Sequence, residues 1–238
     1  MVNMKKISMI VLTVLTFGMT SCDMDKMPYD AIPAEEALTT IVGFEEARAG
    51  IYSVYLGLTG GSYVLAPEVQ ADAFNAVADF SNKYGELHRW TFESTNSTVE
   101  TIWANCYAAI GRANFFIDGV GKIDENPEIE LTEIQKQQIN VYEGEAYFTR
   151  AYCYFYLATL FCRDYDVATA ANTPGLPLQV KYEPQLAATQ YPGRSSLEDT
   201  YKQILEDLEE AEVRIETAKN GIADYDRYIN GAYVTVNT

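Results

Sequence analysis

The longest amphipathic pattern in the chain runs from Leu131 to Cys162. Strict seven-residue intervals separate five of its residues, namely Ile134, Val141, Phe148, Phe155 and Cys162. Neighbouring positions three or four residues away are also mostly apolar, which is the pattern of one helix face. Few residues between 146 and 161 are polar. The pattern therefore predicts a long helix buried in an all-helical core, with Phe148 as a core residue.

Two charged side chains, Glu145 and Arg150, interrupt this apolar helix. A buried charge is costly unless it is paired and hydrogen-bonded. We interpret the two residues as a structural pair of charges that ties the helix to its neighbours. The alternative is a catalytic carboxylate activated by burial.

Two further helices are predicted upstream. Thr39 or Thr40 caps the first, Gly60-Gly61 ends it, and its apolar stripe is Phe44, Ala47, Ile51, Tyr55 and Leu58. The second runs from about Thr98 to Val120, with the stripe Trp103, Tyr107, Ile110, Asn114 and Ile117. Because Asn114 is polar on an apolar face, we expect its side chain to have a structural role, hydrogen-bonded to neighbouring backbone.

A last clear helix is predicted to start at Ser195, in a capping box with Glu198. Its apolar stripe is Leu197, Tyr201, Ile204, Leu205, Leu208, Ala211 and Ile215. The acidic run at 206–210 is expected to be its solvated face. Asn220-Gly221 closes this helix, and another helix is expected to begin after Arg227.

Two long segments, 62–96 and 163–194, lack helical periodicity. The first is rich in aromatic residues, and a long irregular segment in a helical domain is usually functional. The alternative is that its rings pack onto the helices, which we expect of Phe74 and Phe80. Four prolines forbid a long helix in the second segment. The predicted fold class is therefore all-α with long irregular loops, and no large sheet is expected.

The amino-terminal residues have the features of an export signal. Lys5 and Lys6 precede an apolar stretch, residues 7–18, that is too short to span a bilayer. Met19-Thr20-Ser21-Cys22 then reads as a lipobox in which Cys22 is acylated. This predicts a lipoprotein signal peptide over 1–21, a flexible membrane tether over 22–38 and a helical domain over 39–238. The alternative is a secretory signal cleaved near Ser21.

The net charge of −17 argues against nucleic acid and other polyanionic partners. A surplus of tyrosine, 18 residues, suits wet recognition surfaces as well as helix interfaces. No cysteine pair has zinc spacing and His88 is the single histidine, so no metal or cofactor is predicted. Cys106, Cys153 and Cys162 are expected to be core thiols.

Together these segments resemble the SusD/RagB family of surface glycan-binding lipoproteins. The resemblance is carried, in chain order, by the lipobox Cys22, the Trp103-x-x-x-Tyr107-x-x-Ile110-x-x-x-Asn114 stripe, Gly144-Glu145-Ala146-x-Phe148-x-Arg150-Ala151, Gly175-Leu176-Pro177-Leu178, and Arg194-Ser195-Ser196 with Ile204-Leu205-Glu206-Asp207-Leu208-x-x-Ala211. It implies paired helices of tetratricopeptide type. It also implies that the chain is the amino-terminal portion of a protein of about twice this length, more than one ordinary domain.

The resemblance further implies a binding protein rather than an enzyme. Such a protein captures oligosaccharides at the cell surface and passes them to a SusC-like TonB-dependent transporter in the outer membrane. It would be held there by a lipid anchor and face the cell exterior. By position, the implied ligand contacts are Arg89, Trp90 and Asn96, with Tyr63 and Tyr84 behind them.

Two other functions stay open. One is a glycoside hydrolase with paired carboxylates such as Glu68 and Asp72. The other is a structural helical-repeat adaptor that docks on the transporter without a ligand of its own. Trp90 discriminates among the three: a binder should expose it at a concave surface, an adaptor should bury it, and a hydrolase should place it beside two carboxylates.

Overall fold

The computed structural model describes residues 34–76, 84–127, 129–184 and 190–221. The chain divides into two compact units, Met1–Glu36 and Ala37–Thr238. The signal peptide, Cys22 and most of the predicted tether lie outside the described residues, as do Phe80 and the helix expected after Arg227. The short helix α2 (Ala34–Ala37) falls within the last part of the predicted tether.

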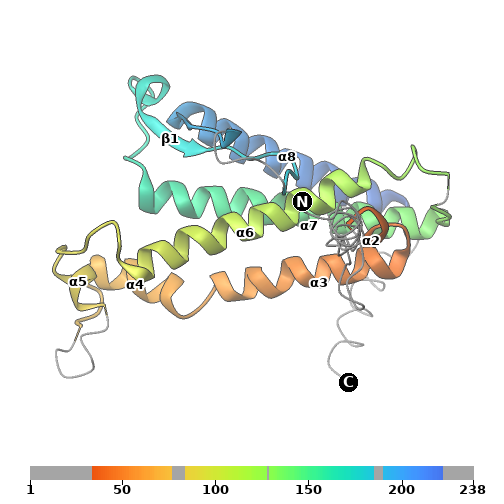
Figure 1. The fold of residues 1–238 in the computed structure, drawn as a ribbon. Coiled ribbons are helices and arrows are strands. Elements are labelled where there is room, and N and C mark those ends of the chain that lie inside the picture. Colours follow the sequence, from red (N-terminus) through yellow and green to blue (C-terminus); the bar gives the residue numbers. More distant parts are fainter. Residues whose placement is uncertain (1–33, 77–83, 128, 185–189, 222–238) are drawn as a thin grey trace, which may run out of the picture. The chain divides into compact units, whose positions relative to one another are not determined.

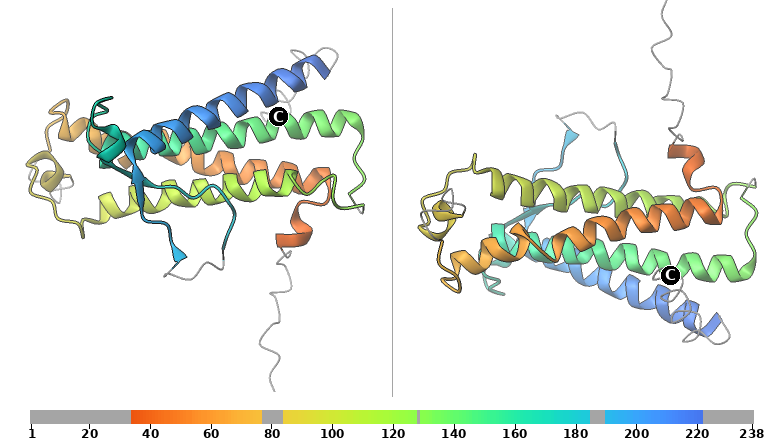
Figure 2. Two further views of the ribbon diagram at one scale, coloured as in Figure 1. Left: turned by 90° about the horizontal axis from the view of Figure 1, so that it is seen from above. Right: turned by 90° about the horizontal axis from the view of Figure 1, so that it is seen from below.

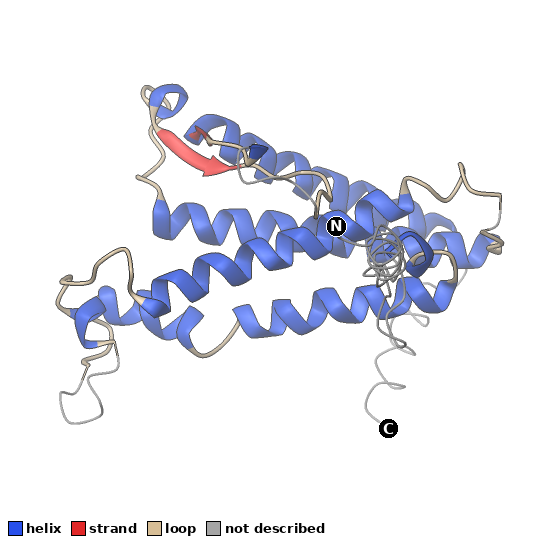
Figure 3. Ribbon diagram, viewed as in Figure 1, coloured by secondary structure: helices blue, strands red, loops and turns tan. Residues whose placement is uncertain are grey.

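Helices make up most of the second unit, so the all-α prediction is confirmed (Figures 1 and 3). The helices are α3 (Ile41–Leu58), α4 (Ser62–Gln70), α5 (Gly85–His88), α6 (Ser97–Val120), α7 (Glu133–Phe161) and α8 (Leu197–Gly221). A 3₁₀ turn, η1 (Ala170–Asn172), precedes the antiparallel pair β1 (Pro174–Pro177) and β2 (Arg194–Ser196). Helix α7 contacts α3, α6 and α8, and these four run lengthwise beside one another (Figure 2).

Polar side chains fix where the long helices begin. Thr40 accepts a hydrogen bond from the Gly43 N–H at the start of α3, as the sequence predicts. Thr132 forms a capping box with Gln135 at the start of α7. At α8 the predicted cap is wrong by one residue. Ser196 accepts from the Asp199 N–H, because the Ser195 hydroxyl donates instead to the Leu176 carbonyl and joins β2 to β1.

The predicted buried face of α7 is wrong at Phe148, which is 43% exposed, and Ile134 and Phe155 are exposed as well. Only Val141 of that stripe is fully buried. Because α7 is apolar nearly all round, several stripes share the same seven-residue period. Neighbouring helices cover other stripes, such as Ile139, Ala146 and Cys153 or Glu143, Arg150 and Leu157.

Four further expectations are corrected. Segment 62–96 contains α4 and α5, so it is not wholly irregular, and Phe74 is exposed rather than packed. On α8, Leu205 and Leu208 are exposed although they were expected in the core. Asp207, expected on the solvated face, is buried with 1% of its surface exposed. The core thiols Cys106 and Cys153 are buried as predicted, and Cys162 is partly exposed.

No helix in the described part of the chain is long and apolar enough to cross a membrane.

Candidate functional site

A groove of about 450 Å³ opens where α4, the start of α6, the end of α7 and the residues after α5 meet. Aromatic rings form much of its wall: Trp103 packs edge-on against Phe161 with centroids 4.9 Å apart, and Phe92 lines it from the α5 side. Gln70, Ser94 and Glu100 add polar groups. An apolar concavity of this size with a few polar groups is the usual form of a small-ligand site.

Trp90 is not itself among the residues that line this groove, but it contacts two that are. Its indole N–H donates to the carbonyl of Gln70 at 3.2 Å, and its ring lies 6.2 Å from that of Phe92. Both partners line the groove. The Trp90 side chain is nevertheless 65% exposed. Its indole is therefore held in place by a polar contact and a ring contact while much of it remains open to solvent.

The backbone around Trp90 is strained. Positive φ angles occur at three non-glycine residues of the described chain, Asp72 (59°), Tyr84 (62°) and Trp90 (55°). Each such residue costs about 1–2 kcal/mol, so surrounding contacts must hold it there. Tyr84 shares a hydrogen bond of 2.8 Å with Ser62, and Asp72 lies 3.5 Å from His88. Strain of this kind clusters at ligand sites.

The other residues singled out from the sequence lie around the same end of the helices but differ in exposure. Asn96 caps α6 and donates to Glu86 at 3.0 Å. Arg89 is exposed and follows α5 directly. Tyr84 is half-buried, whereas Tyr63 is buried beneath the surface and its hydroxyl accepts from Asn105 at 2.5 Å.

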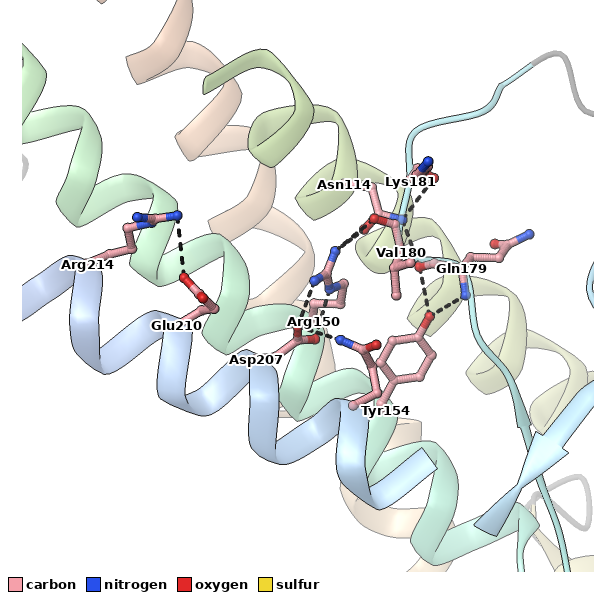
Figure 4. A network of polar contacts seen from close by, with 10 residues as sticks. Asn114, Arg150, Tyr154, Gln179, Val180, Lys181, Asp207, Glu210 and Arg214 are labelled. Atoms are coloured by element: carbon pink, nitrogen blue, oxygen red, sulfur yellow. Dashed lines mark hydrogen bonds and ion pairs between the residues drawn. The ribbon is translucent and has the colours of Figure 1, made fainter. Parts of the chain in front are cut away.

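Glu145 and Arg150 do not pair with each other, which corrects the expected pairing. Glu145 accepts two hydrogen bonds from Arg48 of α3, at 2.5 and 2.8 Å. Arg150 makes a bidentate contact with Asp207 of α8, at 2.6 and 2.8 Å (Figure 4). Each charge thus ties α7 to a different neighbouring helix.

The Arg150 contact belongs to a buried network. Arg150 also donates to the Asn114 side-chain oxygen at 2.7 Å, so one guanidinium joins α6, α7 and α8 (Figure 4). Burial lowers the pKa of Arg150, but the hydrogen bonds and charge of Asp207 outweigh burial and raise it above its ordinary value. Sequence reasoning missed Asp207, because it lies within an acidic run that looks like a solvated helix face.

Residues 175–182, here called the strap, cross these helices in an extended conformation. Side chains from α6, α7 and α8, together with Arg194, bind its main chain. The bonds join Arg194 to Gly175 O (2.6 Å), Thr200 to Leu176 N (3.0 Å), Tyr107 to Pro177 O (2.8 Å), Tyr154 to Gln179 N (2.7 Å), Arg150 to Val180 O (3.3 Å), Asn114 to Lys181 O (3.2 Å) and Asp118 to Tyr182 N (2.7 Å). Asn114 thereby makes the backbone contacts that the sequence predicts for it.

A second cavity, of about 310 Å³, lies between the strap and α6. Tyr182 is the single aromatic residue among the described residues that line it. In the part of the chain that the structure describes, no group of three or more His, Cys, Asp or Glu residues could hold a metal ion. The groove beside Trp90 is therefore the better candidate for a binding site.

Comparison with known proteins gives consistent matches. A family model described as SusD-like, starch-binding and associating with the outer membrane matches residues 35–218. SusD-like protein P2 of Formosa agariphila is 26% identical over 200 residues, covering 78% of this chain and 37% of the relative.

Two crystal structures share the fold, one of a SusD superfamily protein from Bacteroides thetaiotaomicron and one of a SusD-like carbohydrate-binding protein from Bacteroides vulgatus. Both have a TM-score of 0.52, with 19% and 22% identity. Each match covers 72% of this chain but only 36% and 35% of the solved chains. The chain thus spans little more than a third of the length of these relatives.

Proposed function

The chain belongs to the SusD-like family of starch-binding proteins that associate with the outer membrane, and from that premise we propose that it binds oligosaccharides in the groove beside Trp90. The observation that carries the proposal is the exposed indole of Trp90, which contacts Gln70 and Phe92 of an aromatic groove. Aromatic faces pack on the apolar faces of sugar rings, while neighbouring polar groups accept or donate hydrogen bonds to the hydroxyls.

In this proposal, the residues around Trp90 contribute to binding in different ways. Arg89 is exposed, and its guanidinium has the N–H groups that can donate to sugar hydroxyls. Asn96 contributes by capping α6 and by holding Glu86, and Tyr84 by tying its strained backbone to Ser62. Tyr63 supports the site from below as a buried ring.

The wider role follows from the family and from the amino-terminal sequence. In this proposal, the protein is acylated at Cys22, faces the cell exterior and delivers its oligosaccharide to a SusC-like TonB-dependent transporter. Replacing Cys22 with alanine would then abolish labelling with palmitate and release the protein from the membrane fraction. Unchanged labelling of Cys22→Ala would exclude this anchor.

The exposure of Trp90 supports a binder over an adaptor, which would bury that ring. The hydrolase alternative needs two carboxylates that flank the ligand. Glu100 is the single carboxylate among the described residues that line the groove, which weighs against it.

The experiment that tests the proposal is affinity electrophoresis of the purified protein in gels containing starch and other glycans. Trp90→Ala should weaken binding by about 1–3 kcal/mol, as loss of a central aromatic anchor does. Phe74→Ala is the matched control, because Phe74 is a similarly exposed ring in the same segment, whereas Trp90 contacts the groove residues Gln70 and Phe92. If Trp90→Ala migrated as the wild type does in every gel that retards the wild type, the groove would not be the binding site.

A further inference from the structure

The charges around the groove are strongly one-sided. Residues 62–76 and 84–103, which build most of the groove and its rim, carry five carboxylates. Against these stand Arg89 and His88. The carboxylates are those of Glu68, Asp72, Glu86, Glu93 and Glu100.

Glu100 is the charged residue nearest to a bound ligand, because it lines the groove itself. No Lys or Arg is among the described residues of that lining. Glu93 lies between Phe92 and Ser94, both of which line the groove. A volume of 450 Å³ corresponds to a cube of side about 8 Å, which is about one Debye length at physiological salt. A charge on a ligand inside the groove therefore lies within about one Debye length of Glu100 and is only partly screened from it.

The start of α6 is a further feature that would attract an anion, since a helix amino-terminus carries partial positive charge. Two of its N–H groups already have an acceptor. The Asn96 side-chain oxygen accepts from Thr98 N and Val99 N, at 3.1 and 3.3 Å. Glu100, in the first turn, supplies the negative charge that complements the helix dipole.

We propose that the groove selects uncharged glycans and rejects uronate-containing or sulfated ones, and that Glu100 is the principal residue that sets this preference. The inference rests on the proposed function, because it concerns the ligand of the same groove. A neutral sugar meets no charge repulsion beside a carboxylate, and the carboxylate oxygens accept hydrogen bonds from its hydroxyls. A ligand carboxylate or sulfate in the same space meets the like charge of Glu100, and no Lys or Arg of the described lining can pair with it, because Arg89 lies outside that lining.

The test uses polymers matched in backbone and different in charge: starch against carboxymethyl starch, and dextran against dextran sulfate. Binding is measured by affinity electrophoresis at about 10 mM and about 1 M salt, where the Debye length is about 30 and 3 Å. Three proteins are compared, the wild type, Glu100→Gln and Glu133→Gln. Glu133 is a matched control because it also lies in the first turn of a long helix, at the end of α7 that is remote from Phe161 and the groove.

We expect the wild type to bind a neutral polymer at least about tenfold more tightly than its charged counterpart at low salt, a difference of about 1.4 kcal/mol. High salt and Glu100→Gln should each narrow that gap, whereas Glu133→Gln should leave it unchanged.

Two results would overturn the inference while leaving the proposed function intact. One is that charged polymers bind as tightly as neutral ones, with binding that depends on Trp90. The other is a gap that neither salt nor Glu100→Gln alters, since the rejection would then be steric. Failure of every polymer, neutral and charged, to retard the wild type would instead refute the proposed function, and the inference with it.

Discussion

The strap and the segment around Trp90, here its described residues 71–76 and 84–96, are built in opposite ways. Seven of the eight residues of the strap, all but Leu178, have a main-chain group bound by a side chain of a neighbouring element. The Trp90 segment instead contains the three non-glycine residues with positive φ in the described chain. Side-chain hydrogen bonds join its described residues to α4, such as those of Trp90 with Gln70 and of Tyr84 with Ser62.

The difference indicates that the strap has a structural role and that the Trp90 segment is suited to ligand binding. A connection whose polar groups are all satisfied by buried side chains stabilises the fold and keeps the helices in register. A connection held in a strained conformation by a few contacts contributes little to stability, and its exposed rings are available to a ligand. Substitutions should therefore affect stability at the strap and binding at the Trp90 segment.

Arg150→Ala should give the largest loss of stability. It leaves Asp207 buried without its cationic partner and removes the donor to Val180 O of the strap and to the Asn114 side-chain oxygen, so we expect a cost of about 3–5 kcal/mol in the free energy of unfolding. Urea denaturation measures it. The double variant Arg150→Met/Asp207→Leu should cost clearly less, because no charge is left buried. A double variant less stable than Arg150→Ala would show that the charges themselves stabilise the fold.

The second effect concerns pH and a neighbouring ion pair on the same two helices. Burial raises the pKa of Glu143 from 4.5 to about 7, although Arg214 lies 2.9 Å away and lowers it; Glu210 raises it further. The folded state therefore binds the Glu143 proton more tightly than the unfolded state does. Stability from this group is complete below about pH 4.5 and is lost as pH rises through 7.

Glu143→Gln should remove this pH dependence. Between pH 5 and pH 8, the free energy of unfolding of the variant should therefore rise relative to that of the wild type by up to about 3 kcal/mol. Thermal melts of both proteins across that range measure the difference. A constant offset between the two curves would show that Glu143 stays ionised throughout.

Tyr154→Phe should have an intermediate effect that is confined to the strap. The buried hydroxyl accepts from Gln179 N at 2.7 Å and donates to Gln179 O at 2.8 Å. Its removal leaves a buried N–H without a partner, at a cost of about 1–3 kcal/mol. Starch-gel retardation should be unchanged. Reduced glycan binding by a fully folded Tyr154→Phe protein would mean that the strap also shapes the groove.

The smallest stability effect is expected at Trp90. Because the ring is mostly exposed, Trp90→Ala should change the free energy of unfolding by less than about 0.5 kcal/mol. Hydrogen exchange of the native protein gives a second measurement, in which amides of the Trp90 segment should exchange faster than those of the strap. Equal protection of the two segments from hydrogen exchange would show that the Trp90 segment is as stable as the strap.

The sequence predicts the helices well because their start signals are local. Thr40 needs only the next three residues to act as a cap, and the stripe of Phe44, Ile51 and Leu58 is buried on a single face of α3. On α7 the same reasoning fails at Phe148. A helix with apolar residues on most sides has several stripes of equal period, and only the positions of α3, α6 and α8 decide which one is covered.

The candidate site shows the same limit. Trp90 could be selected from the sequence because the family resemblance points to the aromatic segment before the Trp103 helix. Its partner Gln70 and the groove residue Phe161 could not, because α4 and the end of α7 meet it only in the fold. Asp207 has no sequence signal at all, since only the position of Arg150 distinguishes it from the other acids of its run.

The way the strap is held also makes it a good place for a spectroscopic probe. Its bonds use main-chain atoms, while the side chains of Val180 and Lys181 are exposed. A nitroxide or fluorophore attached at Lys181 would therefore leave those bonds in place and sit on a backbone with little freedom to move. The distribution of distances measured from such a nitroxide to a spin-labelled sugar would be narrow enough to locate the ligand on the protein.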